Sequence, residues 1–378
     1  MQKLRVGMIG GGGPQNFFGK VHRRSISLDT TRELVAGALR SNPEDAISSA
    51  KELGINGYPN YKSLVDAVDK EKLDYFTIVT PNDAHFAPAK LCIEKNVPVL
   101  CEKPMTRTVE DAKTLVKIVK SKKVPFILAH TYTGHPMYML AREFVQNGDI
   151  GEVRKVESWY TQGWLANKSE DTGLKQAQWR VNPKKAGISC CGGDIGTHAH
   201  MAVRWITGLE VVKVSAKLNI FIKGRKLDDD FNVFAELENG ATSIITATQI
   251  AIGYKNDNGF RIFGTKGSIE WNQERAESLI VKYGGADKVY WLGANYDYFP
   301  AIIKPYLRLP AGHNEDFFEA LANLHLTMEF IVRKRNGEKN IPVPYSHPGV
   351  EDGLAGMLFL DATVQSSKSN GAWINIKS

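Results

Sequence analysis

The sequence predicts an α/β protein in which a first domain is built on a parallel β-sheet and a second domain on a mostly antiparallel one. A chain of 378 residues is longer than one hydrophobic core usually accommodates, so two domains are expected. Over residues 1–130, short apolar segments alternate with longer amphipathic ones, as in βαβ units. Over residues 131–378, β-branched and alternating segments lie between tight turn signals, which is typical of antiparallel strands.

The strands expected in residues 1–130 are apolar on both faces, which indicates a sheet covered by helices on both sides. They are Arg5–Ile9, Glu33–Ala38, Tyr75–Val79, Pro98–Cys101 and Phe126–Ala129. The segments between them carry apolar residues at helical spacing. The expected helices are Lys20–Leu28, Glu44–Leu53, Ala84–Lys95 and Val109–Lys120.

The strands expected in residues 131–378 alternate in hydrophobicity, which indicates a sheet with one face covered by helices. They are Val153–Thr161, Val211–Phe221, Phe231–Leu237, Ala241–Ile250, Arg261–Gly264 and Ser268–Trp271. The dipeptides Asn239-Gly240 and Lys266-Gly267 between them are hairpin signals. Helices are expected over Gly196–Ile206 and from His313 onward.

The net charge of +7 does not come from a nucleic-acid-binding patch. Lys113, Lys117 and Lys120 recur at helical spacing, and the other face of that segment is apolar, as on a solvated amphipathic helix. A positive bias suits a phosphorylated cofactor equally well. We therefore expect a small-molecule substrate and no nucleic-acid partner.

A cytoplasmic location without membrane association is expected. No stretch approaches the ~18 consecutive apolar residues of a membrane helix, and the first residues do not resemble a signal peptide. The cysteines lack C-x-x-C spacing and are expected to be buried thiols in a reducing compartment. They are Cys92, Cys101, Cys190 and Cys191.

A glycine-rich loop between the first expected strand and the first expected helix predicts a dinucleotide site. Glycines there let the backbone turn sharply and approach a pyrophosphate, whose charge then lies at a helix N-terminus. Gly10 and Gly12 fit G-x-G, whereas the third glycine, Gly19, comes about four residues later than in the usual pattern. The alternative is a glycine-rich surface turn.

The end of the second expected strand favours NADP slightly over NAD. An NAD site usually has a carboxylate there that binds the ribose hydroxyls, but this strand is followed by Arg40 and Ser41. Arg40 could pair with a 2′-phosphate; the alternative is an arginine that points into solvent beside NAD.

Two further segments follow strands at the carboxyl edge of the first sheet, where ligands bind in such folds. Thr80-Pro-Asn82-Asp-Ala-His85 follows one strand, and Glu102-Lys103-Pro104 ends the next. A lysine at this position can contact both a substrate oxygen and the cofactor ribose. By spacing alone, a surface lysine is the equal alternative.

These residues, together with Gly193-Asp194-Ile-Gly-Thr-His198, resemble the glucose–fructose oxidoreductase / inositol dehydrogenase (Gfo/Idh/MocA) family, sugar-oxidising branch. The resemblance covers at least residues 4–272. It implies an N-terminal Rossmann domain, a C-terminal α/β domain with a large, mostly antiparallel open sheet, and a homodimer or homotetramer. It also implies that NAD or NADP is bound by Gly10, Gly12, Gly19, Arg40, Ser41, Thr80, Asn82, His85, Glu102 and Lys103.

The resemblance further implies that Lys103, Asp194 and His198 carry the chemistry. Asp194 and His198 are four residues apart, so both can face one pocket on a helix. A histidine is suited to accept a hydroxyl proton near neutral pH, and a lysine can polarise the reacting oxygen. His200 would face another side of the helix, so no metal site is expected. Candidates for substrate contact are Tyr132, Gln162, Trp164, Trp179, Arg180 and His313.

The predicted function is NAD(P)-dependent hydride transfer to or from a secondary hydroxyl of a sugar, a glycoside (at C3 by analogy) or a cyclitol. One alternative is a glycoside hydrolase that uses tightly held NAD for transient oxidation. A second alternative is a non-catalytic dinucleotide sensor, which would have no need of Lys103, Asp194 and His198.

Overall fold

The computed structural model describes residues 2–13 and 16–377, and its chain forms two compact units. The first unit extends to His135 and also includes Lys304–Tyr306 and Phe317–Leu354, while the other described segments form the second unit. The sequence places both later segments in the domain of residues 131–378. Phe317–Leu354 belongs to the first unit because apolar side chains of residues 317–335 pack in its core. The expected boundary at residue 130 stays a prediction.

The first unit contains a parallel β-sheet, as predicted. Its strands are β1 (Leu4–Gly10), β2 (Arg32–Ala38), β3 (Asn56–Gly57), β4 (Tyr75–Val79), β5 (Val99–Glu102) and β6 (Phe126–Ala129). They lie in the order β3-β2-β1-β4-β5-β6, and all neighbours are parallel. This is the strand order of dinucleotide-binding folds, in which every strand ends at the same edge of the sheet.

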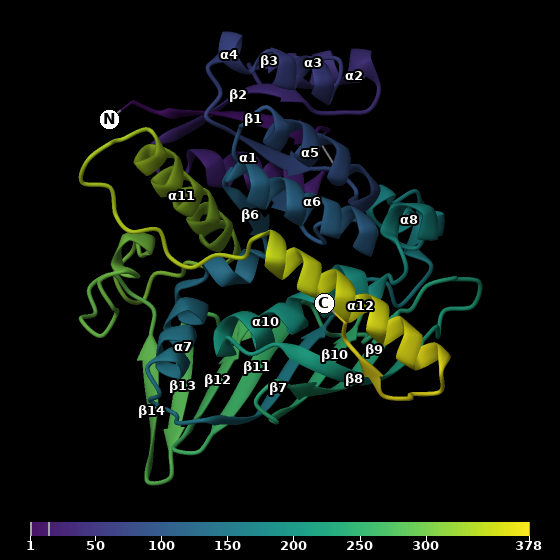
Figure 1. Cartoon of the computed structure of the whole chain (residues 1–378), viewed down its shortest axis with the longest axis vertical. Coiled ribbons are helices and arrows are strands. Elements are labelled where there is room, and N and C mark those ends of the chain that lie inside the picture. Colours follow the sequence, from purple (N-terminus) through teal and green to yellow (C-terminus); the bar gives the residue numbers. More distant parts are fainter. Residues whose placement is uncertain (1, 14–15, 378) are drawn as a thin grey trace. The chain divides into compact units, whose positions relative to one another are not determined.

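Helices cover both faces of this sheet. They are α1 (Phe17–Ser27), α2 (Pro43–Glu52), α3 (Tyr61–Asp66), α4 (Val68–Glu71), α5 (Phe86–Glu94), α6 (Val109–Lys122) and α11 (Phe317–Arg335), with short turns η1 (Asn82–Ala84), η2 (Thr131–Gly134) and η6 (Lys304–Tyr306). Helix α11 lies beside α1, and their apolar residues form one core with β1, β4, β5 and β6 (Figure 1). Helices α5 and α6 pack against each other. The short elements β3, α3 and α4 were not predicted.

The second unit is built on a nine-stranded sheet that is mostly antiparallel, as predicted. Its strands are β7 (Val153–Thr161), β8 (Val211–Asn219), β9 (Asp230–Leu237), β10 (Thr242–Thr248), β11 (Asp257–Gly264), β12 (Ser268–Asn272), β13 (Ser278–Tyr283), β14 (Ala286–Trp291) and β15 (Ile374–Asn375). The order is β14-β13-β12-β11-β7-β10-β9-β8-β15, with β7 and β10 as a parallel pair. Strands β13, β14 and β15 were not predicted.

Helices α7 and α10 pack on one face of this second sheet (Figure 1). The helical segments of the unit are α7 (Pro136–Gln146), η3 (Ser169–Thr172), α8 (Lys175–Arg180), α9 (Pro183–Ala186), η4 (Gly192–Gly196), α10 (Thr197–Thr207) and η5 (Gln273–Arg275), together with most of α12 (Val350–Lys368). The prediction that His313 begins a helix is wrong. His313 lies in a turn, and α11 begins four residues later at Phe317. In the described part of the chain, no helix has the length and apolar character needed to span a membrane.

Candidate active site

The loop after β1 has the sterically confined backbone that the glycine pattern predicts. Gly10, Gly11 and Gly13 have φ angles of +81°, +74° and +94°, a region that favours glycine. At Gly19, near the start of α1, a Cβ atom would lie 1.9 Å from the carbonyl oxygen of Gly11. The late third glycine therefore allows the helix to approach the loop closely, which is the steric role expected of it. Pro14, at the end of the glycine run, lies outside the described residues.

The N-terminus of α1 is formed by a side chain that the sequence analysis did not consider. Asn16 precedes the helix, and its Oδ1 accepts a hydrogen bond of 2.8 Å from the amide of Gly19. This cap explains why the helix begins at Phe17, three residues before the predicted Lys20. The amides at the N-terminus of a helix point out of the helix, which is why such ends can bind a pyrophosphate.

Arg40 lies at the end of β2 against the glycine loop. A Cβ atom on Gly13 would be 2.7 Å from an Nη atom of Arg40, and one on Gly12 would be 3.1 Å from its Cγ. The guanidinium is also paired with Asp45 at 3.2 Å, and both side chains are partly exposed. Ser41 follows, exposed, before α2 begins. The structure thus brings Arg40 together with the predicted loop glycines.

His85 connects the two predicted segments at the carboxyl edge. Its buried ring has Nδ1 2.8 Å from the carbonyl oxygen of Pro104 and Nε2 2.9 Å from that of Thr80. Burial lowers the pKa of His85, although both carbonyl oxygens oppose this shift. Because its ring nitrogens already face protein carbonyls, His85 is placed to hold the two loops together. Its predicted contact with a cofactor stays a prediction, as does that of the buried Asn82.

Glu102 and Lys103 end β5 and are both buried. The peptide bond from Lys103 to Pro104 is cis. Glu102 Oε2 accepts a hydrogen bond of 3.2 Å from the Lys103 amide, and Oε1 lies 2.9 Å from Nε2 of His22 on α1. Burial alone would raise the pKa of Glu102, but the hydrogen bond from His22 and the charges of His22 and Lys103 lower it overall. The carboxylate beside Lys103 is therefore held ionised.

In the second unit, Asp194 lies in a π-helical turn just before the helix that was predicted over Gly196–Ile206. The turn, η4, precedes α10, and two of its glycines, Gly192 and Gly196, lie against the phenyl ring of Phe231 on β9. A Cβ atom would lie 2.5 Å from this ring at Gly192 and 3.1 Å from it at Gly196. Single π-turns of this kind recur at functional sites, where they redirect one side chain.

The turn is also fixed by a buried carboxylate that the sequence analysis missed. Asp228, just before β9, accepts hydrogen bonds of 2.9 Å from Ser189 Oγ and from the amides of Cys190 and Gly192. Burial raises the pKa of Asp228, and these hydrogen bonds oppose the increase. No local pattern marks Asp228, because its partners are more than thirty residues away in the chain.

The Asp194 carboxylate pairs with Arg180, a predicted substrate residue that lies beside two others. Its Oδ2 accepts hydrogen bonds of 2.8 Å from Arg180 Nε and 2.9 Å from Gln249 Nε2. The Arg180 guanidinium lies 4.3 Å from the ring centroid of Trp179 and 5.6 Å from that of Trp164. The structure thus brings together four of the predicted residues and adds Gln249. The charge of Arg180 is neutralised locally by Asp194.

His198 and His200 lie on different sides of α10. The ring of His198 is 5.8 Å from that of Tyr160 on β7, whereas the ring of His200 stacks at 4.2 Å on Phe359 of α12. Across residues 2–13 and 16–377, no group of three or more His, Cys, Asp or Glu side chains is arranged to hold a metal.

Burial lowers the pKa of His200 to about 3, which makes a prediction about acid stability. In the unfolded chain an imidazole binds a proton near pH 6.5. The neutral folded form therefore contributes stability above that pH, and the contribution is lost as the pH falls from about 6.5 toward 3. The free energy of unfolding of the wild-type protein should therefore decrease between pH 7 and pH 4 by about 3 kcal/mol more than that of His200→Leu. Urea denaturation of both proteins at the two pH values measures this difference. The exposed His313→Leu is the control; equal curves for both variants would contradict the prediction.

Of the remaining predicted substrate residues, Gln162 contacts this cluster through Trp164, whereas Tyr132 and His313 have other neighbours. Tyr132 lies in η2 of the first unit, with its ring 6.2 Å from that of Phe317. Gln162 follows β7, accepts a hydrogen bond from Trp164 Nε1 at 3.1 Å, and donates one of 2.6 Å to Asn256. His313 is exposed, with Nδ1 3.2 Å from the carbonyl oxygen of Pro310.

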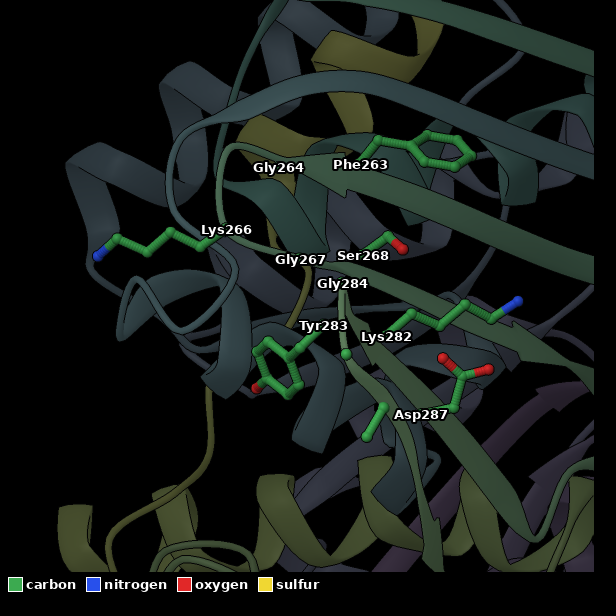
Figure 2. Close-up of a pocket in the computed structure, with 11 residues that line it drawn as sticks. Phe263, Gly264, Lys266, Gly267, Ser268, Lys282, Tyr283, Gly284 and Asp287 are labelled. Atoms are coloured by element: carbon green, nitrogen blue, oxygen red, sulfur yellow. The ribbon is translucent and has the colours of Figure 1, made fainter.

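A cavity of about 570 Å³ at the β11–β12 and β13–β14 turns contains none of the predicted site residues. Its lining includes Lys266, Ser268, Lys282, Tyr283 and Asp287 (Figure 2). The side chains of Lys266 and Lys282 point away from each other (Figure 2).

Comparison with known proteins gives matches to both halves of the chain. Residues 4–130 match the model of an oxidoreductase family with an NAD-binding Rossmann fold, and residues 138–270 match the GFO/IDH/MocA C-terminal domain. Levoglucosan dehydrogenase from Pseudarthrobacter phenanthrenivorans is 29% identical over 420 residues, which cover 100% of this chain and 99% of the relative.

Solved structures of other proteins are similar to nearly the whole of this chain. An oxidoreductase from Sinorhizobium meliloti is 35% identical with a TM-score of 0.87, covering 99% of this chain and 100% of the other. An inositol dehydrogenase homolog complexed with NAD+ from Azotobacter vinelandii is 28% identical with a TM-score of 0.91, covering 99% and 97%.

Proposed function

Since this chain belongs to the GFO/IDH/MocA family of oxidoreductases with an NAD-binding Rossmann fold, we propose that it oxidises a secondary hydroxyl of a sugar, a glycoside or a cyclitol. The observation that carries the proposal is the buried Lys103 at the end of β5. Strands β1 and β5 are parallel in one sheet, so Lys103 and the glycine loop lie at the same edge. Relatives named for levoglucosan and inositol support the substrate class.

The residues at this edge fit a dinucleotide. Gly10, Gly12 and Gly19 would hold its pyrophosphate beside the N-terminus of α1, because a Cβ atom at each of them would collide with backbone or neighbouring side chains. Arg40 and Ser41 would face the adenosine ribose, and Thr80, Asn82 and Glu102 would line the remainder. When bound, the nicotinamide takes up the hydride that leaves the carbinol carbon.

The protein groups would move the proton and stabilise the oxygen. Lys103 donates a hydrogen bond to the reacting oxygen and favours its deprotonation through its positive charge. His198 accepts the hydroxyl proton as the C–H bond breaks, so that the alcohol becomes a ketone. Asp194 fixes a neighbouring hydroxyl or the imidazole, and is itself held by Arg180 and Gln249.

The predicted substrate residues favour a neutral, hydroxylated ring. Trp164 and Trp179 offer apolar faces on which a sugar can stack, and Gln162 offers an amide. Arg180 is already paired with Asp194, so it adds no net charge that would select an anionic substrate. Oxidation at C3 of a glucoside, contact with Tyr132 or His313, and a cytoplasmic location stay predictions. A homodimer or homotetramer is part of the proposal and rests on the family to which the chain belongs.

A panel of sugars, glycosides and cyclitols, with NAD and NADP in turn, tests the proposal by absorbance of the reduced cofactor. The expected result is substrate-dependent accumulation of NADH or NADPH. Release of aglycone from a glycoside without net change in the cofactor would favour transient oxidation by a hydrolase. Tight dinucleotide binding with no turnover of any panel member would favour a sensor and contradict the proposal.

The choice of cofactor depends on Arg40, which lies against the glycine loop. If it pairs with a 2′-phosphate, Arg40→Asp should raise the Kd for NADP at least ~10-fold, about 1.4 kcal/mol, and affect NAD less. Asp45→Asn releases Arg40 from its present ion pair and should strengthen NADP binding. Lys51→Asp, on the exposed side of α2, controls for the change in charge. Equal effects of Arg40→Asp on both cofactors would mean that Arg40 does not read the phosphate.

A further inference from the structure

A network of buried titratable side chains in the first unit ends at Glu102. Tyr75 Oη on β4 lies 2.9 Å from Nδ1 of His325 on α11, and His325 Nε2 lies 3.2 Å from Nδ1 of His22 on α1. His22 Nε2 lies 2.9 Å from Glu102 Oε1. The exposed fraction is 0% for Tyr75, His325 and His22 and 7% for Glu102. Neither the glycine motif nor the Glu-Lys-Pro motif accounts for the two histidines.

The hydrogen bonds of this network can be assigned in one consistent direction. The Glu102 carboxylate only accepts, so His22 Nε2 carries a proton. Tyr75 donates its hydroxyl proton to His325 Nδ1, and His325 Nε2–H then donates to His22 Nδ1. The Thr77 hydroxyl also lies within hydrogen-bond distance of the network, with its Oγ1 3.1 Å from His22 Nδ1. Every ring nitrogen then has a partner, as a buried polar network requires.

Charged groups lie near both ends of the network, Tyr75 and Glu102. Burial raises the pKa of Tyr75, and the nearby Arg32 opposes the shift while Glu329 and Asp74 add to it. Burial lowers the pKa of His325 well below its usual value, and the charges of His22 and Arg32 lower it further. At the other end, Glu102 faces His22, Lys103 and His85.

Packing alone does not explain these residues. The surrounding core is apolar, and includes Val21 and Ile26 of α1 and Leu324 and Met328 of α11. Removing polar groups from water costs free energy that is offset only when they are hydrogen-bonded, so apolar residues would serve a purely structural core at least as well. The network does provide a fixed hydrogen-bond donor, His22 Nε2, for one oxygen of Glu102. The other oxygen accepts a hydrogen bond from the Lys103 amide.

We propose that His22, supported by His325 and Tyr75, is a positioning residue that fixes the Glu102 carboxylate and thereby the backbone and charge of Lys103. The inference rests on the proposed role of Lys103. It makes the reaction dependent on α11, a helix that follows both matched family segments in the sequence. A donor from α1 and its support from α11 thus act on the end of β5.

Two substitutions of His22 distinguish its hydrogen bond to Glu102 from its hydrogen bonds to His325 and Thr77. In His22→Gln the amide nitrogen can take the place of Nε2 and still donate to Glu102. In His22→Asn the shorter amide takes the place of Nδ1, which keeps a partner for His325 and Thr77 but leaves Glu102 without this donor. Hydrogen bonds to charged groups are worth roughly 1.5–3 kcal/mol, so kcat should fall about 10- to 100-fold in His22→Asn. It should stay within about threefold of wild type in His22→Gln, with the KM for NAD(P) little changed in both.

Crystal structures of the two variants without cofactor provide the second readout. The Glu102 carboxylate and the Lys103 side chain should keep their positions in His22→Gln and shift in His22→Asn. If His22→Asn does not fold, Tyr75→Phe removes only the terminal hydroxyl and should lower kcat without changing the KM. Equal kcat values for the Asn and Gln variants with unmoved Lys103 would overturn the positioning role. Wild-type turnover in Lys103→Ala would instead contradict the proposed function.

Discussion

Replacement of His198 by Asn should lower the rate of substrate oxidation by ~10²–10⁴-fold, because the hydroxyl proton would lose its acceptor. The amide retains hydrogen bonding at this buried position on α10, so the fold should be kept. In the wild-type enzyme the rate should fall as the pH decreases through about 6–7, where a histidine base protonates. The variant should lose this acidic limb. Saturating cofactor and a slow substrate keep product release from masking the chemical step.

Asp194→Asn is the matched control for this experiment. If Asp194 only orients the imidazole and stabilises its protonated form, the acidic limb should persist and move to lower pH, because a negative neighbour has been removed. The pairing of Asp194 with Arg180 reduces the size of that shift without changing its direction. A His198→Asn enzyme that keeps both its rate and its acidic limb would exclude this histidine as the base.

Lys103→Ala should lower turnover by ~10²-fold or more and leave dinucleotide binding within a few-fold, because the positive charge acts mainly on the reacting oxygen. Removing the buried Lys103 ammonium also removes one of the groups whose charge favours the ionised Glu102 carboxylate. Binding should be followed by tryptophan fluorescence and turnover by reduced-cofactor absorbance. Lys90→Ala, which removes an exposed ammonium on α5, is the control. Wild-type turnover in Lys103→Ala would contradict the assignment.

Much of the fold could be predicted because its signals are local. The strands Tyr75–Val79, Phe126–Ala129 and Val153–Thr161 match the predicted bounds, since their apolar or alternating residues end at clear turn signals. Helix α11 could not be placed in the first unit from the sequence. Its buried face mixes apolar residues with polar ones such as His325 and Glu329, so it lacks the simple periodicity of an amphipathic helix.

The candidate site divides in the same way. Lys103 and Asp194 could be predicted as site residues because each belongs to a short contiguous motif with a physical meaning. Partners distant in sequence could not be identified: Glu102 depends on His22, 80 residues away, and His22 on His325, 303 residues away. A buried histidine gives no signal in a single sequence until the fold shows what it contacts.

Transfer of deuterium tests the central claim most directly. The best substrate of the panel, labelled with deuterium at the carbinol carbon, should pass its label to the cofactor, so that the NADH or NADPH formed is one mass unit heavier. The labelled substrate should also react more slowly if the C–H bond breaks in the rate-limiting step. Reduced cofactor that carries no deuterium, or product formation without reduced cofactor, would contradict direct hydride transfer from a secondary alcohol.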